Sequence, residues 1–273
     1  MNTLIHIWIL GVDEFTQLFF RRRAIIALAL YAFVVCFVVY GFHRADHTVN
    51  AYLTEQGMPE MKGDEVLKKM GDLSQLHWAK TILNWPLTFP LFQFLAIFWM
   101  TELIAIMSCD IVSGDRERGT LRFLFLRTSR SAFYAGRFLA HLLLYVILHV
   151  LSLALLTVVT VWSSEKLTYG DCITPLLAYS WALIPLIILS LCMTLFASSI
   201  SSSIVGSLLK LHLLWIPVFF VILYDLHPMM SWRTLTGIVV PLDQFATANI
   251  LGNVAIALTF FLLGFLIFRR SEV

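Results

Sequence analysis

The stretch CITPLLAYSWALIPLIILSLCMTLFASSISSSIVGSLL, residues 172–209, decides the fold because it contains no Asp, Glu, Lys or Arg. A helix needs about 20 apolar residues to cross about 30 Å of hydrocarbon, so this stretch is too long for one span and covers most of two. The segment Ser198–Ser203 predicts the break between them, because serine hydroxyls bond their own backbone and compete with a continuing helix. We expect spans over residues 173–197 and 204–224, with Lys210 placed to snorkel.

The composition of the whole chain also indicates a membrane protein. Hydrophobic residues make up 59% of the sequence and charged residues only 13%, which is too little charge for a water-soluble surface. The formal net charge of +2 is too small to indicate a nucleic acid as partner. The cysteines lie in or beside apolar runs without CxxC or Cys/His spacing, so neither a disulfide framework nor a zinc site is expected.

Four further apolar runs complete a prediction of six membrane-spanning helices in one all-α transmembrane domain covering residues 1–273. Lys and Arg in short loops mark the cytoplasmic side, and here they gather before the first span, between the second and third, and after the last. We therefore expect both termini and the loop of residues 110–137 in the cytoplasm. The four further runs are residues 24–42, 85–109, 138–161 and 246–268.

Two segments between spans are predicted to lie on the outer side. Residues 225–245 are bracketed by Pro228 and Pro241, and we expect them to dip partly into the outer leaflet, buried against neighbouring helices. Residues 43–84 carry several histidines and methionines, whose imidazole and thioether groups suit copper. Their irregular spacing favours a small amphipathic external cap instead, and no metal site is predicted.

Residues 1–23, ahead of the first span, have the pattern of an amphipathic helix that ends in the triplet Arg21–Arg23. Such a helix suits the cytoplasmic headgroup layer. It serves either as an interfacial connecting element or as a simple anchor for the first span. Its apolar members include Leu4, Trp8, Leu18 and Phe19, which alternate with Asp13, Glu14 and Gln17.

The cytoplasmic loop between the second and third spans is the most informative segment. A dense charge cluster ends at Gly119, and Thr120 is placed to cap a new helix. Apolar side chains then recur at helical spacing, with Arg122 on another face, which predicts a short amphipathic helix on the cytoplasmic side. This helix either rests on lipid headgroups or docks into a groove of a cytosolic partner. The apolar side chains are Leu121, Leu124 and Phe125.

The same loop contains the run Asp115-Arg116-Glu117-Arg118-Gly119-Thr120-Leu121, followed by Arg127, Ser129-Arg130 and Gly136-Arg137. This pattern resembles the loop of type-2 ABC exporter permeases, in which acidic-Arg-Glu-x-Gly-Thr-Leu is followed by Ser-Arg and then Gly-Lys. Arg137 replaces the usual Lys, and Thr128 stands where a proline is common. The resemblance covers the whole chain, since the six spans and the basic amphipathic start match as well.

The resemblance implies a function and its partners. Glu117–Leu126 is then the coupling helix, which touches a cytosolic ABC ATPase subunit that binds ATP and Mg, while this chain holds no cofactor. The permease works as a dimer with a second permease copy, identical or different, in the cytoplasmic (inner) membrane of a bacterium. The residues that such a contact involves are Glu117, Arg118, Gly119, Thr120, Leu121, Arg122, Leu124 and Phe125.

Catalytic signatures are missing from the sequence. Without a GxxxxGK[ST] motif the chain has no phosphate cradle, so ATP hydrolysis is expected on another polypeptide and the chain is predicted not to be an enzyme. Glu102 lies inside a span, where an acidic group needs a partner or a wet cavity. It either contacts cargo or pairs with a basic residue near the cytoplasmic end of its helix. His141 and His149 share one helix face and are expected to be packed or hydrogen-bonded between helices.

Two hypotheses from different classes follow. The first is the permease subunit of an ABC exporter, for which lipid, peptide, drug and ion cargoes are all compatible with the predicted spans. The second is a membrane anchor or assembly subunit of an envelope or secretion complex, whose loop docks a partner that is not an ATPase. A membrane-embedded enzyme is a weaker third, because no nucleophile and base are paired.

Overall fold

The structure is a computed structural model, and its described residues are helical except for short turns. The predicted re-entrant segment of residues 225–245 and, apart from Arg44, the predicted external segment of residues 43–84 lie outside those residues. The described residues are 3–20, 25–26, 28–37, 39–41, 44, 88–163, 168–223 and 246–270.

Long apolar helices dominate the described part of the chain. Residues 28–37 and 39–41 are helical as well. The labelled helices, in chain order, are α1 (Thr3–Phe20), α5 (Thr88–Ser108), α6 (Ser113–Glu117), α7 (Leu121–Phe125), α8 (Arg130–Ser163), α9 (Tyr169–Ser199), α10 (Ile204–Leu223) and α12 (Ala246–Arg270).

Within the described residues, four segments are long and apolar enough to cross a membrane, and Leu28–Gly41 and Ile204–Pro217 are shorter apolar helices. The four long segments overlap four of the six predicted spans, and the all-helical membrane class expected from the sequence is confirmed. The four are Leu95–Glu117, Arg130–Trp162, Tyr169–Ser199 and Leu251–Arg270.

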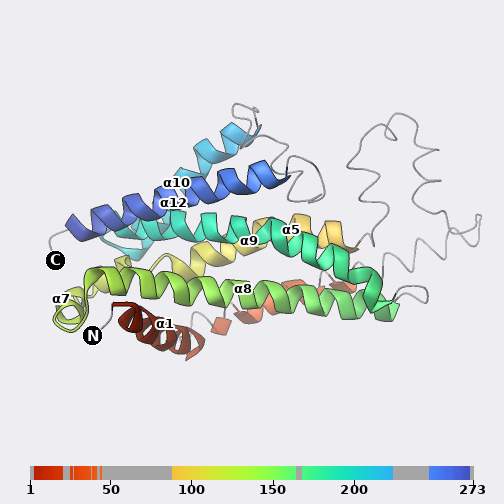
Figure 1. The fold of residues 1–273 in the computed structure, drawn as a ribbon, viewed down its shortest axis with the longest axis horizontal. Coiled ribbons are helices and arrows are strands. Elements are labelled where there is room, and N and C mark those ends of the chain that lie inside the picture. Colours follow the sequence, from red (N-terminus) through yellow and green to blue (C-terminus); the bar gives the residue numbers. More distant parts are fainter. Residues whose placement is uncertain are drawn as a thin grey trace, which may run out of the picture.

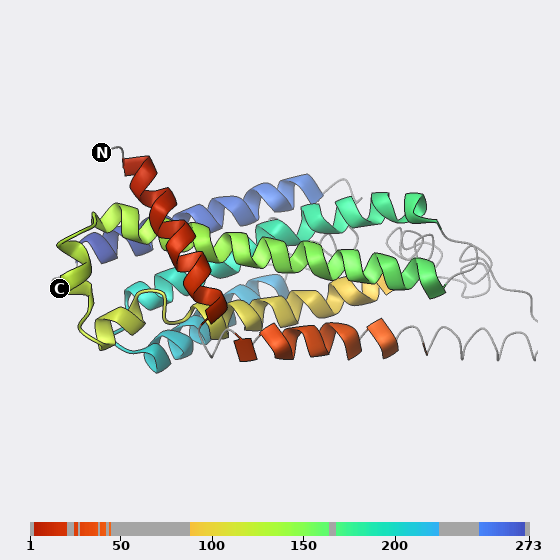
Figure 2. The same cartoon turned by 90° about the horizontal axis from the view of Figure 1, so that it is seen from below.

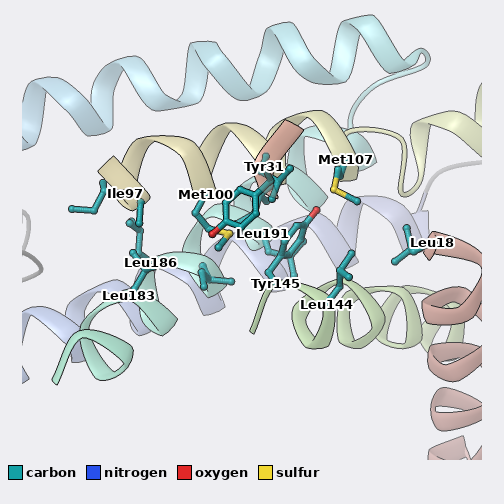
Figure 3. Close-up of a cluster of buried hydrophobic side chains, with 14 of the residues drawn as sticks. Leu18, Tyr31, Ile97, Met100, Met107, Leu144, Tyr145, Leu183, Leu186 and Leu191 are labelled. Atoms are coloured by element: carbon teal, nitrogen blue, oxygen red, sulfur yellow. The ribbon is translucent and has the colours of Figure 1, made fainter. Parts of the chain in front are cut away.

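The helices form an elongated bundle around α9, which packs against α5, α8, α10 and α12. Both chain ends and α7 lie at one end of this bundle (Figure 1). The buried core runs along the bundle axis and contains Tyr31, Met100 and Tyr145, from three different segments (Figure 3). Both buried tyrosines use their hydroxyls, since Ser152 bonds Tyr31 at 3.1 Å and Ser108 bonds Tyr145.

The break predicted from the serine run separates α9 from α10. α9 ends at Ser199 and α10 begins at Ile204. The hydroxyl of Ser199 donates to the Leu195 carbonyl at 2.7 Å, and that of Ser201 donates to the Ala197 carbonyl at 2.6 Å. These bonds hold the final turn of α9 locally, as expected of serines that compete for backbone groups.

α1 lies across α8 at the end of the bundle that carries α7 (Figure 2). The crossing is close because glycines meet there: a Cβ on Gly136 would lie 3.0 Å from the Ile7 carbonyl oxygen and 3.0 Å from Leu10 Cβ. Any larger residue at Gly136 would push the two helices apart.

The two faces of α1 differ from the predicted ones. Trp8 is 68% exposed whereas Leu18 is buried, so these residues do not share one apolar face. Glu14, expected on the polar face, is buried as well. The error arose because the pattern shows an apolar stripe but not that a neighbouring helix covers the opposite side. The exposed apolar stripe consists of Ile5, Trp8, Ile9 and Val12.

Candidate functional site

The loop between α5 and α8 folds as two short helices. The helix that the spacing predicted after Thr120 is confirmed as α7, but the bounds Glu117–Leu126 that the resemblance implied are wrong. α6 ends at Glu117 and α7 begins at Leu121. Gly119 between them has φ of 69°, the left-handed conformation that glycine adopts without a steric penalty. This turn separates α7 from α6.

Thr120 also departs from its predicted role. It precedes α7, but its backbone is already helical and its side chain makes no cap to that helix. Its hydroxyl donates instead to Asp115 Oδ1 at 2.8 Å, while its carbonyl accepts the Phe123 N–H at 3.1 Å. Thr120 therefore ties α7 back to α6.

A buried charge centre fastens α6 to α1 and α8. Asp115 Oδ2 lies 2.5 Å from Arg137 Nη1, and its Oδ1 lies 3.0 Å from Arg118 Nη2. Arg137 Nε lies 3.3 Å from Glu14 Oε2 of α1, and its Nη1 also donates to the Ile111 carbonyl. Arg137, the residue that replaces the usual Lys of the motif, thus connects three helices.

Asp115 lies in this charged loop, beyond the apolar residues of α5. Burial alone would raise the pKa of its carboxyl, but the Arg137 charge and hydrogen bonds from Thr120, Arg118 and Arg137 outweigh burial and hold the pKa below its ordinary value. The carboxylate therefore stays ionised at neutral pH, as its pairing with Arg137 requires.

Arg116 and Glu117, side by side in the sequence motif, contact the junction of α9 and α10. Arg116 Nη1 donates to the Ser199 carbonyl at 2.9 Å and to the Ser201 carbonyl at 2.7 Å. Glu117 Oε2 accepts the Ile204 N–H at 3.0 Å. Glu117, predicted to contact a partner protein, makes this contact within its own chain.

Ser198 is a structural member of the site that the sequence identified only as part of a break. Its buried hydroxyl oxygen accepts the N–H groups of Val112 at 3.0 Å and Ser113 at 2.9 Å, and it donates to the Cys109 carbonyl at 3.1 Å. The first turn of α6 therefore rests on the end of α9. No sequence signal pairs these two segments, which lie far apart along the chain.

The apolar residues predicted to face a partner point into the protein. Leu121 is 1% exposed, and Leu124 packs against the core cluster. Phe125 meets the rings of Phe133 and Phe268 edge-on, at centroid distances of 5.6 and 5.7 Å. These residues anchor α7 to α8 and α12.

The exposed apolar residues of this segment are different ones. Phe123 is 70% exposed and Leu126 is 82% exposed. We call these two residues the α7 tip; Phe123 was not among the residues predicted to contact a partner. Arg122, which was predicted to contact a partner, is exposed beside them.

Arg130 at the start of α8 contacts both the end of α12 and Phe125 of α7. Its Nη1 donates to the Arg269 carbonyl at 2.8 Å, at the end of α12. Its guanidinium carbon lies 5.1 Å from the Phe125 ring centroid. A cation at the carbonyl end of a helix is favourable, because that end carries partial negative charge.

A groove of about 610 Å³ opens between α1 and the loop, beside the α7 tip. Acidic side chains of α1 face arginines of the loop and of α8 across it. The groove is lined by Leu10, Asp13, Glu14, Gln17, Asp115, Arg118, Thr120, Phe123, Leu124, Leu126, Arg127, Phe133 and Arg137.

Glu102 lies away from this loop, on the exposed side of α5. Its Oε2 is 3.5 Å from His212 Nε2 of α10, and both side chains are about half exposed. His141 is buried, and its Nδ1 shares a hydrogen bond of 2.8 Å with the Ser108 hydroxyl of α5. His149 is buried too. In the described ranges, His, Cys, Asp and Glu residues form no group of three or more that would hold a metal ion.

The sequence model of the family described as ABC-2 family transporter protein matches residues 8–273, which is nearly the entire chain. No curated protein matches the sequence. The family match covers α1 from Trp8 onward, the α5–α8 loop with its motif and the long helices. The chain therefore belongs to the ABC-2 family of transporter proteins.

Proposed function

We propose that this chain is the permease subunit of an ABC exporter, which moves its cargo with ATP hydrolysed by a separate cytosolic ATPase subunit. The permease has six spans with both termini in the cytoplasm of a bacterial cell and acts as a dimer in the cytoplasmic membrane. ATP and Mg are bound by the ATPase subunit. The family and the apolar helices support this proposal.

The observation that carries it is the α7 tip. Two large apolar side chains, Phe123 and Leu126, stand exposed at the bundle end that holds both chain termini (Figure 1). Aromatic and aliphatic side chains that fill a pocket of the partner dominate the energy of many protein interfaces. The segment beneath them is tied to several long helices, so force applied to the tip reaches the bundle.

Co-purification of the tagged chain from its native host tests the proposal. We expect an ABC ATPase subunit to be captured with the wild type, and at least about tenfold less with the double variant Phe123→Ala/Leu126→Ala, since each 1.4 kcal/mol of lost interface energy is a factor of ten. Leu258→Ala/Leu262→Ala on α12 is the matched control, because both leucines are exposed, at 55% each. The control should capture the ATPase at the wild-type level.

One outcome would contradict the proposed function, and a second would contradict only the assignment of docking to the α7 tip. If the wild type consistently captures a membrane or envelope complex without an ATPase, the chain is an anchor subunit instead. If the tip variant captures the ATPase as well as the wild type does, the partner docks elsewhere on this end of the bundle.

A further inference from the structure

The α9–α10 break brings the end of α9, at Ser199, close to the start of α10, at Ile204. The last carbonyls of a helix and the first N–H groups of the next lack partners within their own helices. At the end of α9 these groups belong to buried residues, since Ser199 is 1% exposed and Ser201 is 0% exposed, whereas Ile204 at the start of α10 is partly buried. Buried backbone groups of this kind need hydrogen-bond partners from elsewhere in the protein.

Two consecutive loop residues, Arg116 and Glu117, supply hydrogen-bond partners for these backbone groups, and the charge of each side chain is opposite to the partial charge of the helix end that it meets. Arg116, a cation, donates to two carbonyls at the end of α9, at 2.9 and 2.7 Å. Glu117, an anion, accepts the Ile204 N–H at the start of α10, at 3.0 Å. Carbonyl ends of helices favour cations and N–H ends favour anions, so each side chain faces the helix end that suits its charge.

The other end of α6 is attached to the same junction. Ser198, 0% exposed, accepts the N–H groups of Val112 and Ser113 just before and at the start of α6. α6 is thus held at its first turn by the end of α9 and at its last residues by both sides of the break. So short a helix, fixed at both ends, has little freedom to move independently of the junction.

We propose that Arg116 and Glu117 are positioning residues that clamp α6 across the α9–α10 break, so that a displacement of α7 moves the end of α9 and the start of α10 together. The source of that displacement rests on the proposed function, whereas the clamp itself does not. In this assignment Glu117 bonds α10 of its own chain, and the α7 tip contacts the partner protein.

Lys210 provides a matched control for the clamp. Its Nζ donates to the Ile200 carbonyl at 2.8 Å, so it links α10 to α9 within the same junction but without the loop. A variant at Lys210 therefore perturbs the junction while leaving the attachment of α6 intact.

The clamp is tested first without the ATPase, by spin-label distances in the full chain. In a Cys36→Ser background, which removes the exposed cysteine, one label is placed at Arg122→Cys and one at Leu209→Cys of α10. We expect Arg116→Ala/Glu117→Gln to widen the distance distribution at least about twofold and Lys210→Met to leave it unchanged. A second label pair, Arg122→Cys with Leu262→Cys of α12, should keep the wild-type width of its distance distribution. Arg130 still bonds the end of α12 and contacts Phe125 of α7 in this variant.

Two results of this measurement would overturn the clamp. One is an unchanged distribution for the Arg122–Leu209 pair in the double variant. The other is equal widening of both label pairs, which would mean that the loop has unfolded as a whole rather than detached from the junction.

The transmission is tested in the complex with its captured ATPase. With labels at Leu209→Cys and Leu262→Cys, we expect a non-hydrolysable ATP analogue to shift the α10–α12 distance in the wild type. The Arg116→Ala/Glu117→Gln variant should capture the ATPase within about twofold of the wild type and lose at least about four fifths of the shift.

Each failure of this second test has its own meaning. Loss of ATPase capture in the clamp variant would overturn the proposal and assign Arg116 and Glu117 to docking. If the α10–α12 distance of the wild-type complex does not shift with nucleotide, the proposed transmission from α7 to α10 is refuted. The clamp itself is tested by the first experiment alone. If no ATPase is captured even by the wild type, the proposed function has failed, and with it the transmission.

Discussion

At the scale of single residues, the loop motif serves internal structure more than surface recognition. Asp115, Arg116 and Glu117 all bond to other helices of the same chain. Gly119 supplies a left-handed turn, and Leu121 is buried beneath α7. The surface left for a partner is small and consists of side chains that the motif does not specify.

Gly119→Ala should destabilise the protein by about 1–2 kcal/mol, because an L-residue in the left-handed conformation suffers a clash between its Cβ and the backbone. Gly41→Ala is the control: neither glycine has other atoms within 4 Å of an added Cβ, but only Gly119 has a positive φ. Thermal unfolding of the detergent-purified protein measures the difference. Equal melting temperatures for the two variants would contradict the assigned turn.

Leu121→Ala and Leu126→Ala make the same chemical change at a buried and an exposed position of the loop. Removing buried Leu121 should cost about 2–5 kcal/mol of unfolding free energy, from lost burial and the cavity left behind. Removing exposed Leu126 should leave stability within about 0.5 kcal/mol and weaken ATPase capture. Unfolding and co-purification of both variants check the assignment, which fails if their effects are interchanged.

Asp115 predicts a pH dependence whose direction follows from its lowered pKa. A carboxyl with a lower pKa in the folded state contributes its stability fully above its unfolded pKa of about 3.9 and loses it as pH falls through the folded value. The stability difference between wild type and Asp115→Asn should therefore be constant from about pH 8 to 5 and shrink below about pH 4. Urea unfolding at stepped pH measures it; a difference that disappears near pH 6 would rule out this ion pair as its source.

At the scale of elements, periodicity predicted the helices well but not which of their faces are covered. The serine run marked the end of α9 because serine acts on its own backbone, which is a local effect. By contrast, the apolar side of α7 was assigned to a partner, whereas Phe133 and Phe268 pack against Phe125 there. Spacing identifies an apolar stripe, and tertiary structure decides what lies against it.

The contacts of the clamp and of the charge centre also could not be predicted from the sequence. Ser198 and Val112 meet across 86 residues of sequence, and Glu14 meets Arg137 across a still longer separation. One sequence contains no signal for such pairs, because a hydrogen bond between distant segments leaves no period in the chain. The sequence therefore singled out the loop residues but did not predict their hydrogen bonds to α9 and α10.

Gly136→Val should separate α1 from α8. The added side chain would meet the Ile7 carbonyl and Leu10 at the helix crossing, and overpacking of this kind costs typically about 1–3 kcal/mol. In the Cys36→Ser background, which removes the exposed cysteine, Leu18→Cys is placed at a position that is 2% exposed in the wild type. It should react with maleimide when Gly136→Val is added and stay protected when Gly170→Val is added. Equal protection in both backgrounds would show that the crossing tolerates the larger residue.

At the scale of the whole molecule, both chain ends and α7 share one end of the bundle (Figure 1). For the proposed topology we expect cysteines at Thr3, Arg122 and Arg270, each in the Cys36→Ser background, to react with an impermeant maleimide only after the membrane is opened. A cysteine at Tyr169, at the other end of the bundle, should react in intact cells. Labelling of all four positions from the same side would refute this topology.

The length of α8 has a consequence for what the α7 tip meets. Its 34 residues extend about 51 Å at about 1.5 Å per residue, which exceeds the roughly 40–45 Å of a bilayer with its headgroups. Even at a typical tilt of about 20°, the helix outspans the lipid. For the proposed topology we therefore expect the first turns of α8, which carry Arg130 and Arg137, to lie at or beyond the headgroup layer and to hold Phe123 and Leu126 within reach of a cytosolic protein.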